Sequence, residues 1–143
     1  DLLRHDLTLG GTPVGCDHGF CGGCTGLING EAARSCLALA VQADGAEITT
    51  IEGLRNRETG QLHAIQQAFV DAHGLQCGFC TPGFIMATLE LLRDNPQPSD
   101  EQIKEALDGN LCRCTGYESI IASVRLAAER LNTTRLAAVR VSA

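Results

Sequence analysis

The chain has 143 residues, and its 17 acidic residues outnumber 11 Lys and Arg to give a net charge of −6. It holds one lysine, Lys104, and only four Phe, one Tyr and no Trp, so it offers neither a basic track nor a stacking platform for nucleic acid. Its longest apolar run, near residues 36–41, is far shorter than the roughly 20 residues that a membrane-spanning helix needs. We therefore expect no nucleic acid partner and no membrane span.

The first residues, DLLRHDL, have the pattern of the middle of an amphipathic helix, with Leu2, Leu3 and Leu7 on its apolar side. Because the sequence opens inside this pattern and on Asp1, we expect an upstream segment that is missing here. Any targeting signal would lie in that segment. We expect a cytoplasmic location, and a periplasmic one stays open.

A change of composition near residue 60 predicts two domains. Residues 1–55 are rich in Gly and short extended runs, whereas the later residues follow the helical period of 3.6. This division predicts domains at residues 1–55 and 56–131, then a C-terminal tail at residues 132–143. In the first domain, Asn29-Gly30 predicts a type I′ hairpin and residues 47–51 predict a further strand.

The second domain has the pattern of four short helices, which predicts a compact bundle. Thr81 is the predicted N-cap of the second helix, and Ser99 with Gln102 forms a capping box for the third. A lone His near a helix end, such as His63, is interpreted as a surface or capping group. In the tail, Leu136, Val139 and Val141 favour docking along a partner over disorder. The predicted helices span residues 61–73, 82–94, about 100–108 and 118–131.

Eight cysteines fall into two quartets, and the early one has the spacing C-x4-C-x2-C followed by a fourth Cys. This is the plant-type spacing for four thiolates that hold a [2Fe-2S] cluster. Glycines between these cysteines let the backbone wrap closely and direct N–H groups at sulfur. Zinc and disulfides are alternatives that fit the spacing less well. The early quartet is Cys16, Cys21, Cys24 and Cys36, and we expect Cys36 to reach the site from the far strand of the hairpin.

The late quartet is less specific on spacing alone, because two close cysteine pairs suit zinc or a [2Fe-2S] cluster equally well. Each pair directly precedes a predicted helix, whose positive end favours a negatively charged cluster. Phe79 and Phe84 are interpreted as core cover of the first pair. No acid pair, Ser–His arrangement or phosphate loop stands out, so we predict no catalytic residue and expect substrate chemistry on another chain. The late quartet is Cys77, Cys80, Cys112 and Cys114.

Three stretches carry a resemblance: GCDHGFCGGCTGLINGEAARSCLALA, QCGFCTPGFIMA and GNLCRCTGYESI. Together they closely resemble the iron–sulfur subunit of the molybdenum hydroxylases, the family of xanthine oxidase, aldehyde oxidoreductase and carbon monoxide dehydrogenase. The resemblance runs from Asp1 to about Arg130. It implies an α+β chain, with a plant-ferredoxin-like β-grasp domain, whose first hairpin is missing from this sequence, followed by a four-helix bundle.

The resemblance also implies one [2Fe-2S] cluster in each domain, the early one nearer FAD and the late one nearer molybdenum. Gln76 and Cys114 match the family residues that contact molybdopterin. The implied partners are a large subunit that binds molybdopterin, in its cytosine dinucleotide form, and a medium subunit that binds FAD. The three chains would form a heterotrimer or a dimer of heterotrimers.

The resemblance implies a direction of electron flow, from molybdenum through the late cluster and then the early cluster to FAD. A free-standing ferredoxin-like carrier and a zinc-stabilised interaction module are the alternatives. The substrate stays open, because selectivity would lie in the pocket of the large subunit.

Overall fold

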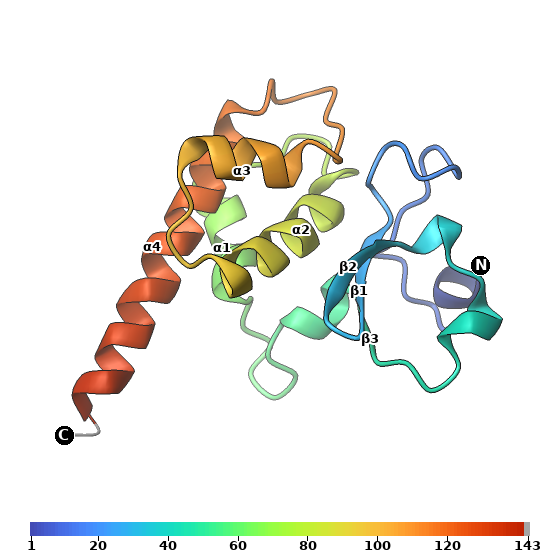
Figure 1. Cartoon of the computed structure of the whole chain (residues 1–143), viewed down its shortest axis with the longest axis horizontal. Coiled ribbons are helices and arrows are strands. Elements are labelled where there is room, and N and C mark those ends of the chain that lie inside the picture. The colour runs from blue at the N-terminus through green and yellow to red at the C-terminus, as the bar shows by residue number, and fades with distance from the viewer. Residues whose placement is uncertain (142–143) are drawn as a thin grey trace.

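The computed structural model describes residues 1–141, with side chains through residue 134. Within this part, a small antiparallel sheet and its loops lie beside a group of four α-helices (Figure 1). The strand order is β2-β1-β3, so β1 lies at the centre. The chain therefore combines a sheet half and a helical half, as the α+β prediction requires.

The sheet half contains strands β1 (Thr25–Ile28), β2 (Glu31–Arg34) and β3 (Ile48–Thr49). Asn29 and Gly30 have φ angles of 52° and 86°, which is the left-handed pair that a type I′ turn needs, so the predicted hairpin is confirmed. β3 is shorter than the predicted strand, because the chain turns at Ile51–Leu54 into the 3-10 helix η4.

The opening segment forms a single turn of π-helix, η1 (Leu2–Asp6), and not a longer amphipathic helix. Leu2 and Leu7 are 40% and 53% exposed, so the predicted apolar side is only partly covered in this structure. Two further 3-10 turns, η2 (Ser35–Leu37) and η3 (Ala40–Ala43), lead from β2 toward β3.

The α-helices are α1 (Ala64–Asp71), α2 (Thr81–Asp94), α3 (Asp100–Leu107) and α4 (Glu118–Val141). The capping box of α3 is confirmed, since Ser99 Oγ accepts the N–H of Gln102 at 3.4 Å and Gln102 Oε1 accepts the N–H of Ser99 at 2.8 Å. The prediction for α2 was wrong by one residue: Cys80 is its N-cap and Thr81 already lies inside the helix.

Two helix ends also differ from the sequence pattern. α1 begins later than predicted because His63 caps it, with Nδ1 accepting the N–H of Ile65 at 3.3 Å. α4 continues past Leu131 to Val141, so much of the predicted tail extends this helix. No Gly or Pro interrupts residues 118–141, which explains the continuation. The side chains of Leu136, Val139 and Val141, on which the docking prediction rests, lie outside the described side chains.

The hydrophobic core lies almost entirely in the helical half. Its fully buried side chains include Phe69, Phe84, Ile120 and Val124, and Ile51 and Leu54 of η4 pack against the same core. The sheet half buries mostly small or polar side chains: Thr12, Cys24, Thr25, Leu27 and Thr50. The two halves meet where β1 packs on α2. Among the described residues, no helix is both long and apolar enough to cross a membrane.

Candidate metal centres

The early quartet starts in a loop that wraps around the Cys16 thiol. Asp17, Gly19 and Gly22 have φ angles of 59°, 79° and 72°, and these left-handed turns bring the chain back onto its own sulfur. The N–H groups of Phe20 and Cys21 each donate to Cys16 Sγ at 3.3 Å. Backbone amides of His18 and Cys21 lower the pKa of the Cys16 thiol to about 6. The loop therefore favours the thiolate, which is the form that binds iron.

Cys24 and Cys36 form the other pair of this quartet. Cys24 is 2% exposed and directly precedes β1, whereas Cys36 lies in the 3-10 turn η2 and not on the far strand as predicted. β2 is short and ends at Arg34, so the turn after the strand presents the thiol. Burial and the neighbouring Cys24 thiol raise the pKa of Cys36. A thiolate at Cys36 would therefore need a bound metal ion to stabilise its negative charge.

The late quartet is assembled by the starts of two helices. Cys80 is the N-cap of α2, and Cys112 and Cys114 lie in the loop before α4. The Sγ atoms of Cys77 and Cys114 are 3.6 Å apart, and both residues are exposed. Burial, followed by the neighbouring Cys112 thiol, raises the pKa of Cys80 to about 12. The prediction that each late pair lies just before a helix is confirmed.

Two residues support Cys112 in ways that the sequence pattern did not reveal. Burial opposes ionisation of this thiol, but hydrogen bonds from Thr115, Cys114 and Cys80 together lower its pKa, with Thr115 Oγ1 at 3.2 Å from Cys112 Sγ. Tyr117 Oη accepts the N–H of Cys112 at 3.0 Å, and its ring packs edge-on against Phe84. The sequence Thr115-Gly116-Tyr117 could have indicated this support, because a hydroxyl three residues after a cysteine ligand can reach the sulfur of that ligand.

The thiols are arranged in pairs. All eight cysteines are free, and the 3.6 Å between Cys77 and Cys114 sulfurs is far longer than a disulfide bond of about 2.05 Å. Among the described residues, no three His, Cys, Asp or Glu side chains converge as a site for one metal ion would require. Neighbouring thiols instead pair as Cys16 with Cys21, Cys24 with Cys36, Cys77 with Cys114, and Cys80 with Cys112. Two thiolates for each of two irons fit a [2Fe-2S] cluster better than a zinc ion.

Both quartets open onto one hollow between the two halves. This cavity of about 400 Å³ is lined by Cys16 and Cys21 of the early quartet and by Cys80 and Cys112 of the late one. Phe79 also lines it and is 51% exposed, so its interpretation as core cover was wrong, whereas Phe84 is fully buried as predicted. Two cofactors bound by these cysteines would lie on either side of this hollow.

Gln76 and Cys114, the predicted molybdopterin contacts, are both exposed. Gln76 directly precedes Cys77, whose sulfur lies beside that of Cys114. The structure therefore brings the two residues to the same end of the late quartet, on the surface.

A family model for a [2Fe-2S] binding domain matches residues 50–125. The nicotine 6-hydroxylase small subunit of Paenarthrobacter nicotinovorans is 54% identical over 87% of this chain and 73% of its own length. The caffeine dehydrogenase subunit gamma of Pseudomonas sp. strain CBB1 is also 54% identical, over 87% of this chain and 75% of its own.

Solved structures give the same result. A chain of quinoline 2-oxidoreductase from Pseudomonas putida 86 superposes with a TM-score of 0.87 at 48% identity, covering 93% of this chain and 82% of that one. Aldehyde oxidoreductase from Desulfovibrio gigas gives a TM-score of 0.87 at 43% identity, covering 94% of this chain and 15% of that one. The chain therefore belongs to the family of [2Fe-2S] iron–sulfur subunits of the molybdenum hydroxylases.

Proposed function

We propose that this chain passes single electrons from a molybdopterin site on a large subunit, through two [2Fe-2S] clusters, to FAD on a medium subunit. The observation that carries this proposal is that two cysteines of each quartet line one hollow, while Cys77 and Cys114 of the late quartet are exposed. A [2Fe-2S] cluster, when bound, accepts and releases one electron.

In this proposal the cysteines of each quartet are the iron ligands, and the surrounding groups tune them. The backbone N–H groups on Cys16 Sγ and the Thr115 hydroxyl on Cys112 Sγ stabilise negative charge on sulfur. Hydrogen bonds to ligand sulfur raise the reduction potential of an iron–sulfur cluster. The two sites receive these bonds from different sources, so their potentials should differ.

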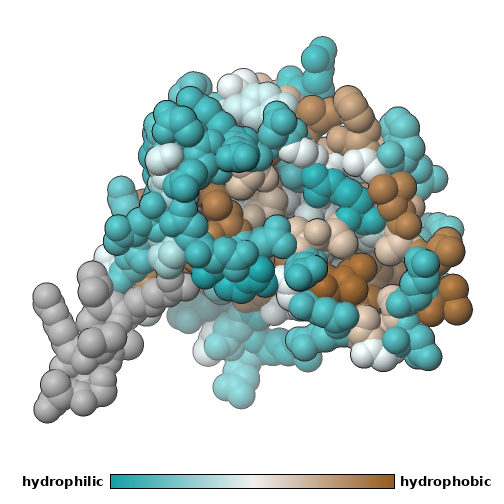
Figure 2. All heavy atoms as spheres, in the orientation of Figure 1, coloured by the Kyte–Doolittle hydropathy of each residue, from teal (hydrophilic) through white to brown (hydrophobic). Residues whose placement is uncertain are grey.

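Exposed apolar side chains occur beside both quartets, which supports partner subunits on both sides of the chain. Figure 2 shows hydrophobic residues gathered on the side of the molecule where the sheet half lies. Clusters of exposed apolar residues on a protein surface often mark interfaces. Val14, Phe20, Leu37, Leu39 and Val41 follow or flank the early cysteines, and Leu75, Phe79 and Leu111 flank the late ones.

We assign the early side to the FAD-binding subunit and the late side, with Gln76 and Cys114, to the subunit that binds molybdopterin in its cytosine dinucleotide form. The assembly would be a heterotrimer or a dimer of heterotrimers. The cytoplasm is the proposed compartment, since its reducing conditions keep eight thiols available for cluster assembly.

Substitution of Gln76 and Cys114 in the assembled enzyme tests the proposal. Cys114→Ala should abolish one of two electron spin resonance signals of the reduced protein, spare the early cluster, and perturb the molybdenum signal. Gln76→Ala should keep both cluster signals and still perturb molybdenum. Gln97→Ala, at an exposed Gln distant in sequence from every cysteine, is the matched control. An unchanged molybdenum signal in both site variants would refute the pterin-contact role.

A further inference from the structure

The contact surface between the sheet half and the helical half, here called the seam, contains a buried side-chain amide at the end that lies near the cysteines. Asn110, which precedes Cys112 and Cys114 of the late quartet, is only 2% exposed. Its Nδ2 donates to the carbonyl oxygen of Gly22 at 2.9 Å, and its Oδ1 accepts from Arg34 Nη2 at 3.4 Å. Gly22 lies between Cys21 and Cys24, so one side chain of the helical half holds the early cluster loop directly.

The packing around this amide is close enough to exclude side-chain atoms. A Cβ on Gly83 of α2 would overlap the carbonyl of Gly22, and it would lie 2.9 Å from Asn110 Nδ2. A Cβ on Gly22 would lie 2.5 Å from the carbonyl oxygen of Gly109. Arg34 Nη2 also donates a hydrogen bond to the carbonyl oxygen of Gly109, at 2.6 Å. The early loop, α2 and the loop after α3 are thus fixed against one another at this point.

The amide lies beside a short route between the two quartets. The N–H of Leu111 donates to the carbonyl oxygen of Cys21 at 2.9 Å. Leu111 follows Asn110 and is covalently bonded to Cys112, so this hydrogen bond joins the residue before a late cysteine to the backbone of an early one. The side-chain bond from Asn110 to Gly22 and this backbone bond connect adjacent residues on both sides, so each holds the other in register.

We propose that Asn110 is a positioning residue for electron transfer between the two cysteine sites. Asn110 maintains the hydrogen bond between the Leu111 N–H and the Cys21 carbonyl, and it thereby fixes the distance between the two cysteine sites. In this step one electron leaves the late site and arrives at the early one, with no bond formed or broken and no proton moved. This inference rests on the proposed function and adds to it a residue that belongs to neither cysteine quartet.

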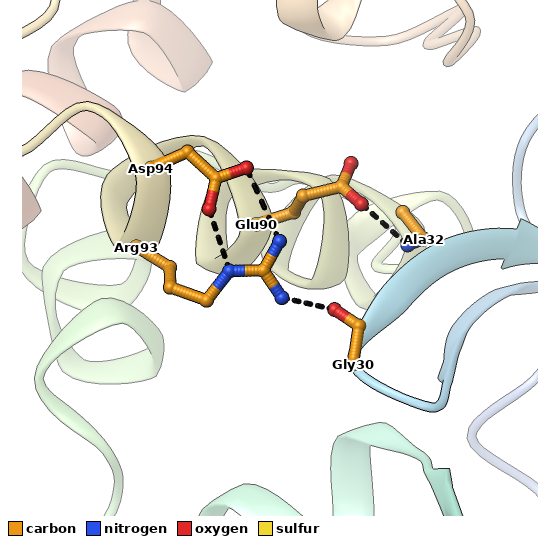
Figure 3. Close-up of polar contacts among 5 residues, drawn as sticks. All are labelled: Gly30, Ala32, Glu90, Arg93 and Asp94. Carbon is orange, nitrogen blue, oxygen red and sulfur yellow. Dashed lines mark hydrogen bonds and ion pairs between the residues drawn. The ribbon is translucent and has the colours of Figure 1, made fainter.

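A second contact across the same seam provides the comparison. At the far end of the hairpin, Glu90 Oε1 on α2 accepts the N–H of Ala32 at 2.5 Å, and Arg93 donates to the carbonyl of Gly30 (Figure 3). Asp94 holds the Arg93 guanidinium at 2.6 Å. These contacts also join the sheet half to α2, but they lie at the hairpin turn and away from the cysteine loops.

The experiment compares Asn110→Ala and Glu90→Ala in the assembled, cluster-loaded enzyme. The readouts are the spin coupling between the two reduced clusters, the rate at which the early cluster is reduced in a single turnover, iron content and the thermal midpoint. Asn110→Ala should keep its iron, change the coupling and slow the transfer, because the rate of electron transfer falls steeply as the distance between the two sites grows. Glu90→Ala should lower the thermal midpoint and leave coupling and rate unchanged.

The isosteric Asn110→Asp variant keeps the volume and the acceptor for Arg34 but loses the donor to Gly22, so it should behave as Asn110→Ala does. Unchanged coupling and rate in the Asn110 variants, or equal changes in Glu90→Ala, would overturn the proposal. Loss of folded, iron-loaded protein in both Asn110 variants would also overturn it, since the residue would then act in folding. If the unsubstituted enzyme itself lacked two cluster signals, the proposed function would fail instead.

Discussion

The sheet half and the helical half build thiolate sites by different means. In the sheet half, a glycine-containing loop turns back so that its own N–H groups reach Cys16 Sγ, and few large side chains are buried. In the helical half, a core that includes Phe69, Phe84 and Val124 sets the helix starts that present the cysteines. The loop around Cys16 is thus shaped mainly by its own backbone, whereas the late site depends on tertiary packing of the helices.

This difference implies unequal dependence on the cofactor. A small hydrophobic core supplies little stability, and bound metal commonly compensates for it. The helical half has its own core, whereas the sheet half has its cysteines and its seam with α2. We therefore expect the sheet half to lose order first when iron is removed.

Iron removal should produce the largest effect. The binding free energy of a structural metal adds to the free energy of folding, and it reaches about 10–16 kcal/mol for zinc in small domains. Hydrogen exchange on the chelated protein should show lost protection in residues 15–36 and retained protection in α2 and α4. Equal loss of protection in both halves would remove the distinction between them.

Phe84→Ala should destabilise the helical half by about 3–5 kcal/mol, because it empties a site that is 0% exposed. Denaturant titration of the cluster-loaded protein measures this loss. Phe20→Ala is the matched control: that ring is 70% exposed, so its removal should change the unfolding free energy by about 0.5 kcal/mol or less. Similar losses from both variants would contradict the assignment of the core.

Ser99→Ala should cost about 1 kcal/mol of unfolding free energy, since it removes the acceptor for the Gln102 N–H at the start of α3. Ser99→Gly should cost only a few tenths of a kcal/mol, because Gly suits the N-cap backbone. Chemical denaturation of the unsubstituted protein, Ser99→Ala and Ser99→Gly measures the three free energies of unfolding. A larger loss for Gly than for Ala would argue against the cap as the source.

His63 should give a small pH effect at the start of α1. Burial lowers the pKa of this imidazole below its ordinary value of 6.5, so the unfolded chain binds the proton more readily. The stability that neutral His63 contributes is present above about pH 6.5 and is lost as the pH falls through the lower folded-state pKa. His63→Asn keeps a side-chain acceptor at the cap but has no group that titrates in this range. The difference in thermal midpoint between the unsubstituted protein and His63→Asn should therefore narrow or reverse from pH 7.5 to pH 5. A constant difference would exclude this role.

The features that could be predicted from the sequence are those that a few neighbouring residues determine. Asn29-Gly30 fixes a turn, Ser99 with Gln102 fixes a helix start, and the spacing of the early cysteines fixes a loop around sulfur. Membership of the iron–sulfur subunit family, predicted from the motifs, is confirmed by the relatives. Local pattern suffices where a few neighbouring residues decide the conformation.

The features that were missed depend on residues distant in the sequence. Asn110 meets Gly22 across 88 positions, and no periodicity reports that contact. The placement of Cys36 in a turn depends on where β2 ends, and the exposure of Phe79 depends on how the early loop packs. The proposed ligand assignments and the proposed roles of Gln76 and Cys114 likewise depend on contacts with groups outside this chain.

The most direct test of the account is the content and spectrum of iron in the purified chain. We predict about four iron atoms and four acid-labile sulfides per chain, with two distinct rhombic spin resonance signals after reduction by dithionite. The two signals should differ in shape, since the two sites receive different hydrogen bonds. A colourless chain that holds two zinc atoms, or a reduced protein with a single cluster signal, would contradict the account.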